Sequence, residues 1–476
     1  MKQFILKIAW QPVIPLITLM FALLSCDSKE GGRANIKHDP NKPIVITSFE
    51  PDSGRLREMV LIDGENFGSD NSIIKVFFNS AEAKVVGSTG STILALVPRM
   101  PGDTCVLSVQ INSQTDEYEQ KKFFYKMDAT VTTIAGNGER RANYEPVWDQ
   151  GLDKTVLTPV YIGIDRDDNV LVTAGRTGPD EDYLFRINPR ESTISLVATR
   201  SQHGFRHRCA PYVNPQTNVI QMGTEDNTRD NFLFIDPKDG WAPKPMYIKT
   251  WDWNGMSEMT SANNGFRHFH ILLNEEDGYF YTRYESGLIA KIDPVTWHAQ
   301  AVGYTARGYA LGMAFNPIRK SELWIGFYEN ASTNQPDANG ICMVDVSDTT
   351  RYWSENPSNP YLLKSYKKMS HPVTANNLHR DGPLEQAQFY QIRMISFDSQ
   401  GNLYVGDCGN HCIRMVNTKT MMVSTIIGIP KVSTPFRDGN KDYATFNQPH
   451  GIVVDSQDII YVADYSNNRV RRIAIE

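Results

Sequence analysis

A four-residue motif that occurs twice in the sequence contains side chains that are well suited to ligand binding. Gly204–His207 and Gly265–His268 both read Gly-Phe-Arg-His, so each supplies one arginine and one histidine. Guanidinium and imidazole groups donate hydrogen bonds to hydroxyls and carboxylates. These residue types predict a site for a polar ligand, and the candidates of this kind are Arg206, His207, Arg267, His268, His270, Tyr309, Arg393 and His450.

An aromatic pair adds a stacking platform to this set. Trp251-Asp252-Trp253 places two indoles two residues apart, and a sugar ring stacks well against such a surface. Trp253 therefore joins the ligand-binding candidates, with Tyr284, Tyr309 and Trp353 as lesser ones. The alternative stays open that these rings pack in the core and that the histidines donate to backbone carbonyls.

A metal site is a second interpretation of the histidines, because several imidazoles brought together bind transition metals. No His-Glu-x-x-His motif is present, and the neighbouring arginines would repel a divalent cation. Five cysteines follow Cys26, without zinc-finger spacing, and whether Cys408 and Cys412 form a disulfide stays open. The sequence therefore favours a site without metal or other cofactor.

The elements that position these residues come from a repeat. Arg437–Ile473 restates Arg380–Val416, with an alternating apolar strand, a polar turn and a second strand. The same pattern opens the series at Asp165, and weaker copies begin at Asn214, Asn274 and Asn316. About six units, each of roughly 40 to 60 residues with several strands, predict a β-propeller.

The segment Pro449–Ile473 resembles the NHL repeat, so residues 128–476 are similar to a six-bladed NHL-type β-propeller. The resemblance implies that the innermost strands of the blades start at one mouth of a central channel, where the candidates would converge. Ala129–Gly136 is similar to the outer strand of a blade, which the last unit lacks. We expect this segment to close the ring, and we expect the Arg-Asp-Gly copies at Arg380 and Arg437 to be structural.

The preceding region, residues 43–126, is a series of short alternating strands separated by Gly, Pro, Asp and Asn, which predicts a β-sandwich. Ile46–Gly68, together with the later Phe-Phe-Asn, Leu-Val-Pro and Phe-Phe-Tyr stretches, resembles the IPT/TIG immunoglobulin-like domain. The resemblance implies a spacer or a protein-contact module. The fold class is thus all-β, with an Ig-like β-sandwich followed by a propeller.

The N-terminus has the features of an export signal. Residues 1–25 combine positive charge with a short apolar run, and Leu23-Leu24-Ser25-Cys26 resembles a bacterial lipobox. The resemblance implies that Cys26 is lipidated and that residues 26–42 form a flexible tether. The acidic stretch beginning at Asp27 is similar to the surface-export signal of Bacteroidetes lipoproteins, whereas by enterobacterial rules Asp27 would imply retention in the inner membrane. We expect an outer-membrane protein that contacts the membrane through its lipid anchor only.

The net charge of -6 and the absence of a Lys/Arg run argue against nucleic acid as a partner. Anchor, tether, Ig-like spacer and terminal propeller together resemble the surface glycan-binding lipoproteins of Bacteroidetes. The resemblance implies a non-catalytic protein that binds a polysaccharide or other polymeric ligand through the propeller face, with an outer-membrane transporter complex as a partner. The alternatives are a protein-binding adhesin or scaffold, and a metal-dependent lyase or hydrolase like the propeller lyases.

Overall fold

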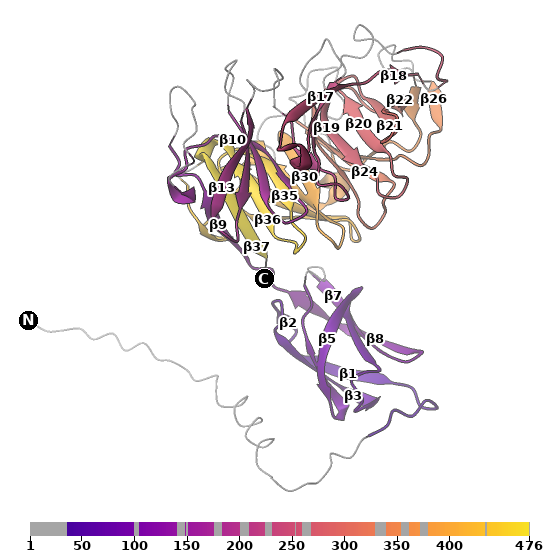
Figure 1. Ribbon diagram of the computed structural model, residues 1–476. Coiled ribbons are helices and arrows are strands. Elements are labelled where there is room, and N and C mark those ends of the chain that lie inside the picture. The colour runs from indigo at the N-terminus through magenta and orange to yellow at the C-terminus, as the bar shows by residue number, and fades with distance from the viewer. Residues whose placement is uncertain are drawn as a thin grey trace, which may run out of the picture. The chain divides into compact units, whose positions relative to one another are not determined.

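The computed structural model describes residues 36–99, 104–139, 148, 151–175, 183–199, 209–223, 231–252, 254–258, 268–328, 339–353, 361–371, 379–433 and 436–475. The chain divides into two compact units, Met1–Tyr125 and Lys126–Glu476. Strands dominate both units (Figure 1). Short 3₁₀ helices occupy Leu152–Lys154, Pro237–Asp239, Leu384–Gln386, Cys408–Asn410 and Tyr465–Asn467.

The first unit is an Ig-like sandwich. Its strands are β1 (Val45–Glu50), β2 (Ser53–Gly54), β3 (Met59–Gly68), β4 (Ile74–Phe78), β5 (Ala81–Ser88), β6 (Gly90–Leu96), β7 (Thr104–Ile111) and β8 (Gln114–Tyr125). They are hydrogen-bonded in the order β1-β3-β6-β5-β4-β7-β8-β2. Alternation along β3 buries Val60 and Ile62 and leaves Met59 exposed, as a strand with one face on a core requires.

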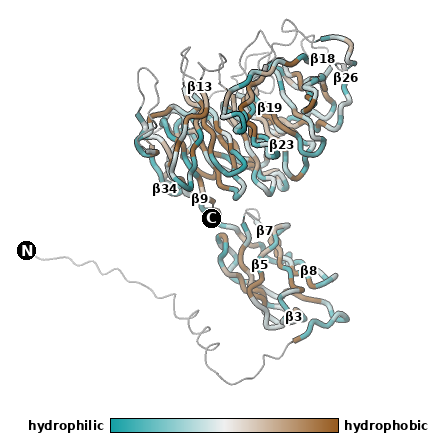
Figure 2. The backbone as a smooth tube through the Cα atoms, in the orientation of Figure 1, coloured by the Kyte–Doolittle hydropathy of each residue, from teal (hydrophilic) through white to brown (hydrophobic). Residues whose placement is uncertain are grey.

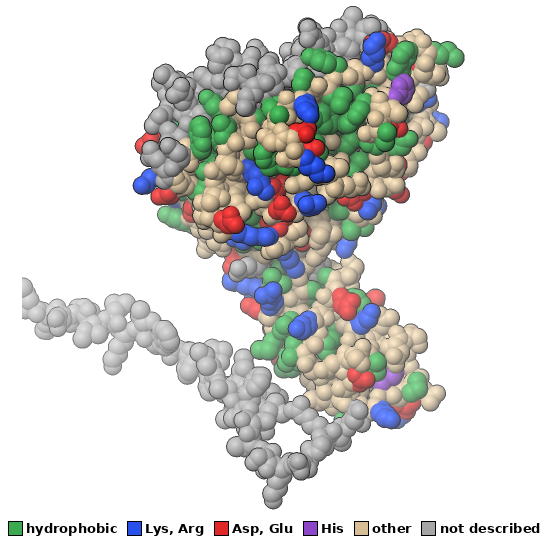
Figure 3. All heavy atoms as spheres, viewed as in Figure 1, with side chains coloured by type: hydrophobic (Ala, Val, Ile, Leu, Met, Phe, Trp, Pro, Cys, Tyr) green, Lys and Arg blue, Asp and Glu red, His purple; other side chains and the backbone are tan. Residues whose placement is uncertain are grey.

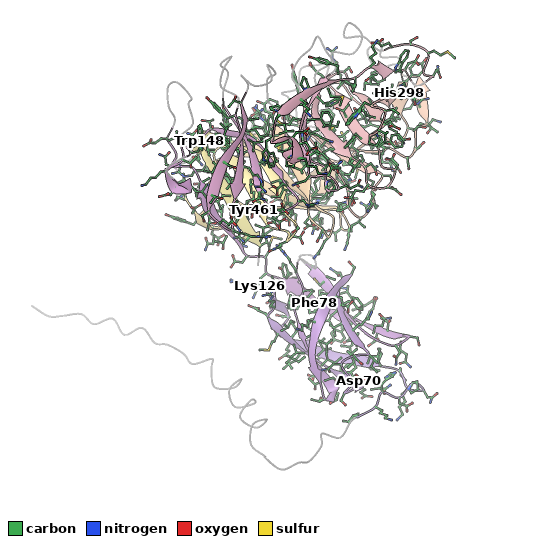
Figure 4. All side chains as sticks on the ribbon, viewed as in Figure 1. Asp70, Phe78, Lys126, Trp148, His298 and Tyr461 are labelled. Carbon is green, nitrogen blue, oxygen red and sulfur yellow. The ribbon has the colours of Figure 1, made fainter. Side chains whose placement is uncertain are left out.

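The two layers of this unit meet through aromatic rings. Phe49 of β1 packs edge-on against Tyr118 of β8, with ring centroids 5.7 Å apart, although these strands lie far apart in the hydrogen-bonding order. Phe78, labelled in Figure 4, makes a similar contact with Phe123 at 4.8 Å. Both rings are fully buried. These pairs hold the sheet folded over its own core, which confirms the predicted sandwich.

The second unit is a β-propeller of six sheets, which we number as blades 1 to 6. Blade 1 consists of β10 (Pro159–Ile164), β11 (Val170–Ala174), β12 (Tyr183–Asn188) and β13 (Thr193–Thr199). Blade 2 consists of β14 (Tyr212–Val213), β15 (Ile220–Met222), β16 (Asn231–Ile235) and β17 (Pro243–Tyr247). Blade 3 consists of β19 (His268–Leu273), β20 (Phe280–Tyr284), β21 (Leu288–Ile292) and β22 (Ala299–Tyr304).

Blade 4 consists of β23 (Ala310–Phe315), β24 (Glu322–Phe327), β25 (Ile341–Asp345) and β28 (Lys367–Lys368). Blade 5 consists of β30 (Ile392–Phe397), β31 (Asn402–Asp407), β32 (Cys412–Asn417), β33 (Met422–Ile427) and β29 (Gly382–Pro383). Blade 6 consists of β35 (Pro449–Val454), β36 (Ile460–Asp464), β37 (Arg469–Ile475), β9 (Ala129–Ala135) and β34 (Gly439–Asn440). Apolar residues follow the strands of the blades (Figure 2). The predicted all-β class and propeller are confirmed.

The inner strands β10, β14, β19, β23, β30 and β35 contact one another in a closed ring. Glycines allow the closest approaches: a Cβ on Gly451 of β35 would lie 3.0 Å from the Ile162 nitrogen of β10, and one on Gly312 of β23 would lie 3.0 Å from the Ile395 nitrogen of β30. Apolar side chains fill the space between neighbouring blades. Trp324 of blade 4, for example, packs in one cluster with Leu403 of blade 5.

The ring closes as the sequence predicts. Strand β9 pairs antiparallel with the C-terminal strand β37, from Ala129 opposite Ile475 to Ala135 opposite Val470. The first strand of the propeller thereby becomes the outer strand of blade 6. This arrangement joins the first and last strands of the propeller and covers an edge that would otherwise be open to other chains.

The repeated turns explain why blades 1, 5 and 6 share a sequence pattern. The Asp398 carboxylate accepts from the N–H groups of Gln400 and Asn402, at 3.0 and 2.8 Å. Asp165 and Asp455 hold their own turns in the same way. This side-chain capping fixes the polar turn between the first two strands of each blade.

Two buried arginines anchor the last two blades. Arg414 and Arg471 are 0% exposed, and each donates to two carboxylates and two backbone carbonyls. Arg471 bonds Asp438 and Asp464 and the carbonyls of Thr445 and Arg437. Arg414 makes the equivalent bonds in blade 5. The Arg-Asp-Gly copies supply part of this lattice, so they are structural, as expected.

Blades 3 and 4 depart from the regular pattern. The fourth strand of blade 4, β28, has only two residues. The hairpin of β26 (Arg351–Trp353) and β27 (Tyr361–Leu363) instead adds to the outer edge of blade 3, where β27 runs parallel to β22. Strand β18 (Thr250–Trp251) also joins this edge. None of these three pairings follows from the repeat.

Candidate functional site

The inner strands of the blades all begin at the same end of the ring, because residues at similar positions in neighbouring inner strands lie against each other. The third residue of β35 lies against the fourth of β10, and the third of β23 lies against the third and fourth of β30. We call this end the channel mouth. The first residues of the inner strands there are Pro159, Tyr212, His268, Ala310, Ile392 and Pro449.

Arg393 is the centre of the side-chain cluster at the channel mouth. It is the second residue of β30, and its guanidinium lies 3.8 Å from the centroid of the Tyr328 ring. The guanidinium also hydrogen-bonds the Tyr161 side chain of blade 1 and the Cys408 side chain of its own blade. Arg393 is thus held by three blades, and it remains half-buried.

Tyrosines surround this arginine. The Tyr328 N–H donates to the Tyr309 carbonyl at 2.9 Å, and both rings pack against Cys209 and Leu311. Tyr390, two residues before the start of β30, lies so close to Gly409 that a Cβ there would be 2.1 Å from the tyrosine ring. We call Tyr161, Tyr309, Tyr328, Tyr390, Arg393 and Cys408 the mouth cluster.

The mouth cluster provides no negative charge for Arg393. Its neighbours among the described residues are two phenols and a thiol, and none of the described carboxylates pairs with it. Burial raises the pKa of the Cys408 thiol to about 11, even though Arg393 pulls it the other way, so the thiol is neutral at neutral pH. The Arg393 Nε is buried and has no hydrogen-bond partner. The guanidinium is therefore charged, and no carboxylate in the described part of the chain compensates that charge.

His270 is placed near the cluster but is bound to the backbone. The ring is buried in β19, and its Nε2 donates to the Leu311 carbonyl of β23 at 2.7 Å. Burial lowers the pKa of His270 to about 4, so the imidazole is neutral at physiological pH. In this arrangement His270 joins blades 3 and 4, which is the structural alternative that the sequence left open.

His450 holds the position in blade 6 that Arg393 holds in blade 5. It is the second residue of β35, it is 5% exposed, and its ring stacks on Tyr465 at 3.9 Å with an interplanar angle of 8°. The carbonyls of Met394 and His450 both approach Gly406. The structure therefore places His450 beside the strand that carries Arg393.

The structure brings four of the sequence-predicted residues to the channel mouth or next to it, namely His270, Tyr309, Arg393 and His450. Strand β19 begins at His268, whose side chain is not described. Trp251 lies beside the outermost strand of blade 3, with its ring 6.3 Å from that of His298. The remaining predictions, Arg206, His207, Trp253, Arg267 and the lipidation site Cys26, lie outside the described residues.

Sequence reasoning missed four members of the cluster: Tyr161, Tyr328, Tyr390 and Cys408. Position relative to the repeat was the available signal. Tyr328 directly follows the second strand of blade 4, Cys408 follows that of blade 5, and Tyr390 precedes an inner strand. Such positions reach the same end of a propeller as the starts of the inner strands.

Three further findings concern metals, cysteines and membranes. In the described part of the chain, no group of three His, Cys, Asp or Glu side chains is arranged to hold a metal ion. Cys408 and Cys412 are both buried, free thiols. Among the helices that the structure describes, none is long and apolar enough to cross a membrane.

Comparisons with known proteins agree with both units. Residues 43–125 match the IPT/TIG domain and residues 446–473 match the NHL repeat. NHL repeat-containing protein 2 of Bos taurus is 32% identical over 84 residues, which are 17% of this chain. The match spans only 11% of the length of that relative.

Solved structures with the same fold come from Bacteroides. A protein of unknown function from Bacteroides thetaiotaomicron superposes with a TM-score of 0.63 at 21% identity, over 92% of this chain and 100% of that one. An auxiliary nutrient binding protein from the same organism gives 0.54 at 20% identity, over 92% and 99%. Another from Bacteroides ovatus gives 0.53 at 18% identity, over 92% and 100%.

Proposed function

We propose that this chain is a non-catalytic, surface-exposed binding protein that captures a polysaccharide or another polymeric ligand at the channel mouth. The observation that carries the proposal is the mouth cluster, in which tyrosine rings surround a half-exposed, charged arginine. Tyrosine offers a flat apolar face with a polar tip, and arginine offers several donors in one plane. This combination suits a ligand with ring faces and many oxygen atoms.

Two of the similar structures are of auxiliary nutrient binding proteins, which supports a role in nutrient capture. We further propose that Cys26 carries a lipid anchor in the outer membrane and that the captured ligand passes to an uptake system there. On this proposal, residues 26–42 tether the protein and residues 43–126 act as a spacer. The propeller then binds the ligand without a metal or other cofactor.

Affinity electrophoresis in gels cast with different polysaccharides tests the proposal. At least one glycan should retard the wild-type protein. Tyr328→Ala should abolish most of that retardation because it removes the ring on which Arg393 lies, whereas Tyr247→Ala on the outer strand β17 should not change it. The sequence-based prediction that Trp253 belongs to the site is tested by Trp253→Ala in the same gels. If no glycan retards the protein, or if Tyr328→Ala migrates as the wild type does, the proposal fails.

A second candidate function is protein binding, as an adhesin or scaffold. The Ig-like unit exposes Met59, Leu61 and Val86 at 47%, 40% and 47%. Met59 and Leu61 lie opposite Leu96 and Leu94 on the neighbouring strand β6. Apolar side chains grouped on one sheet face are typical of protein contact. Leu61→Glu would weaken binding to a protein partner, and it would leave glycan retardation unchanged.

A further inference from the structure

Three buried or half-buried arginines in blades 5 and 6 allow a comparison within one protein. Arg414 and Arg471 each bond two aspartates, at 2.6 to 2.9 Å. Arg393 has no aspartate or glutamate partner in the part of the chain that the structure describes. Among the residues that the structure describes, counter-charges therefore accompany the two structural arginines, and none accompanies the arginine at the channel mouth.

Two buried carboxylates that act on the Cys408 thiol, Asp407 and Asp464, are not free to serve Arg393. Asp407 accepts hydrogen bonds from the Tyr390 N–H, from the Asn410 side chain and from Arg414. Asp464 is held in the same way by Asn447, Asn467 and Arg471. Burial raises the pKa of both carboxyl groups, and their own arginines oppose this effect. Each aspartate is thus satisfied within its own blade.

Burying a cation without a counter-charge is costly, and cation–π contact with Tyr328 offsets only part of that cost. Two neutral acceptors, the Tyr161 phenol and the Cys408 thiol, use part of the donor capacity of the guanidinium. A guanidinium has five N–H donors. In the described part of the chain these two acceptors are fewer than the five donors, and the buried Nε has no hydrogen-bond partner. The guanidinium therefore keeps donor capacity beside a ring of tyrosines.

We propose that the mouth cluster selects an acidic glycan, whose carboxylate or sulfate ester pairs with Arg393 while a sugar ring stacks on Tyr328 or Tyr390. This inference rests on the proposed function and names the class of ligand for the same site. An oxyanion supplies the missing counter-charge and accepts two parallel N–H groups, which is the geometry that guanidinium groups prefer. A neutral sugar leaves the charge uncompensated.

Selection here depends on local contact and not on long-range attraction. The net charge is -6, and the visible face of the propeller mixes lysine and arginine with aspartate and glutamate (Figure 3). A mixed surface does not steer anions from a distance. Because the pair with Arg393 is partly buried, its strength should depend only weakly on salt. A basic surface that collected polyanions would behave in the opposite way.

Calorimetric titration with matched pairs of oligosaccharides tests this inference. One pair is tetragalacturonate and its carboxyl-reduced, neutral form; the other is a sulfated galactan oligosaccharide and its desulfated form. The acidic member of at least one pair should bind the wild type about 10- to 100-fold more tightly. The pair that shows the preference identifies the oxyanion as carboxylate or sulfate. Arg393→Gln should remove the preference, and Arg393→Lys should restore only part of it.

Arg166→Gln is the matched control, because Arg166 is an exposed arginine in the turn that follows the inner strand β10. It should bind both members of each pair as the wild type does. Equal binding of acidic and neutral forms by the wild type, or an unchanged preference in Arg393→Gln, overturns the inference. If neutral glycans retard the protein in gels and neither acidic oligosaccharide binds, the inference falls and the proposed function stands. If no glycan binds at all, both fall.

Thermal unfolding gives a readout that does not need the ligand. Arg393→Met should leave the melting temperature of the full chain unchanged or raise it, because the substitution removes an uncompensated cation. Arg414→Met should lower it, because Asp407 and Asp381 lose their partner. If Arg393→Met is as destabilising as Arg414→Met, Arg393 is a structural residue and the inference is wrong.

Discussion

Replacing Arg471 by alanine should destabilise the propeller by about 4 kcal/mol. Asp464 is 0% exposed and bonds Nη1 of Arg471 at 2.7 Å, so removing the arginine leaves a buried carboxylate without its counter-charge. Breaking a buried ion pair from one side typically costs about 3–5 kcal/mol. Two backbone carbonyls also lose their donor.

The substitution should also weaken the pairing of β9 with β37, which closes the ring. Asp438 accepts from Arg471 through Oδ1 and from the Thr133 N–H of β9 through Oδ2, both at 2.9 Å. Without Arg471, the carboxylate that holds both β9 and β37 is less firmly placed. We therefore expect the variant to unfold with a lower free energy and to lose the cooperative transition of the ring.

Urea denaturation followed by tryptophan fluorescence measures this effect selectively. Apart from Trp10 in the expected signal peptide, every tryptophan lies after Lys126, so the signal reports the propeller and not the Ig-like unit. Arg472→Ala is the control, because Arg472 is the next residue on β37, points to the other face and is only half-buried. It should cost less than about 1 kcal/mol.

A double-mutant cycle separates the ion pair from the rest of the loss. Asp464→Asn alone should destabilise the propeller, and the double variant with Arg471→Ala should be more stable than the sum of the two losses predicts, by about 2 kcal/mol. A loss below about 1 kcal/mol for Arg471→Ala, or a loss equal to that of Arg472→Ala, would refute the reasoning about buried anchors.

Three further predictions follow from the geometry. Burial lowers the pKa of His270 from an ordinary 6.5 to about 4, so folding favours the neutral imidazole. The resulting stabilisation, about 3 kcal/mol, is fully present above pH 6.5 and is lost as the pH falls toward 4. His270→Gln should therefore flatten this part of the curve of urea stability against pH. Thr133→Pro should destabilise the propeller by about 1.5–3 kcal/mol, measured by the same fluorescence assay, because the Asp438 carboxylate loses a donor. Cys408, whose thiol is buried with its pKa raised to about 11, should react with a thiol reagent only after denaturation, and fast labelling of native Cys408 would show that the mouth is more open than the structure indicates.

Much of the fold could be predicted because local sequence patterns encode it. The alternating strands and the Asp-led turns repeat along the chain, and the strand missing from the last unit has a counterpart in Ala129–Ala135. The insertion of β26 and β27 could not be predicted in this way. Its pairing with blade 3 depends on which sheet edge is open in space, and no periodicity in the sequence records that.

The candidate site was predicted only in part, for a related reason. His270 and Arg393 are equally polar in the sequence, but His270 is committed to the Leu311 carbonyl and Arg393 is not. Only the packing distinguishes them. Tyr328 was missed because it stands at the end of a strand outside the two clearest repeats, where nothing in the sequence links it to Arg393.

Comparison of the two clearest repeats separates fold from function. Residues that the blade needs recur at equivalent places, so Arg414 and Asp407 of blade 5 match Arg471 and Asp464 of blade 6 in identity and in bonding. The mouth residues do not recur, because Arg393, Tyr390 and Cys408 stand where blade 6 has His450, Asn447 and Tyr465. A fold requirement would act on both blades alike. The positions at which the copies differ are therefore those that a single asymmetric ligand at the channel mouth can use. They include Arg393, which has no counter-charge among the residues that the structure describes.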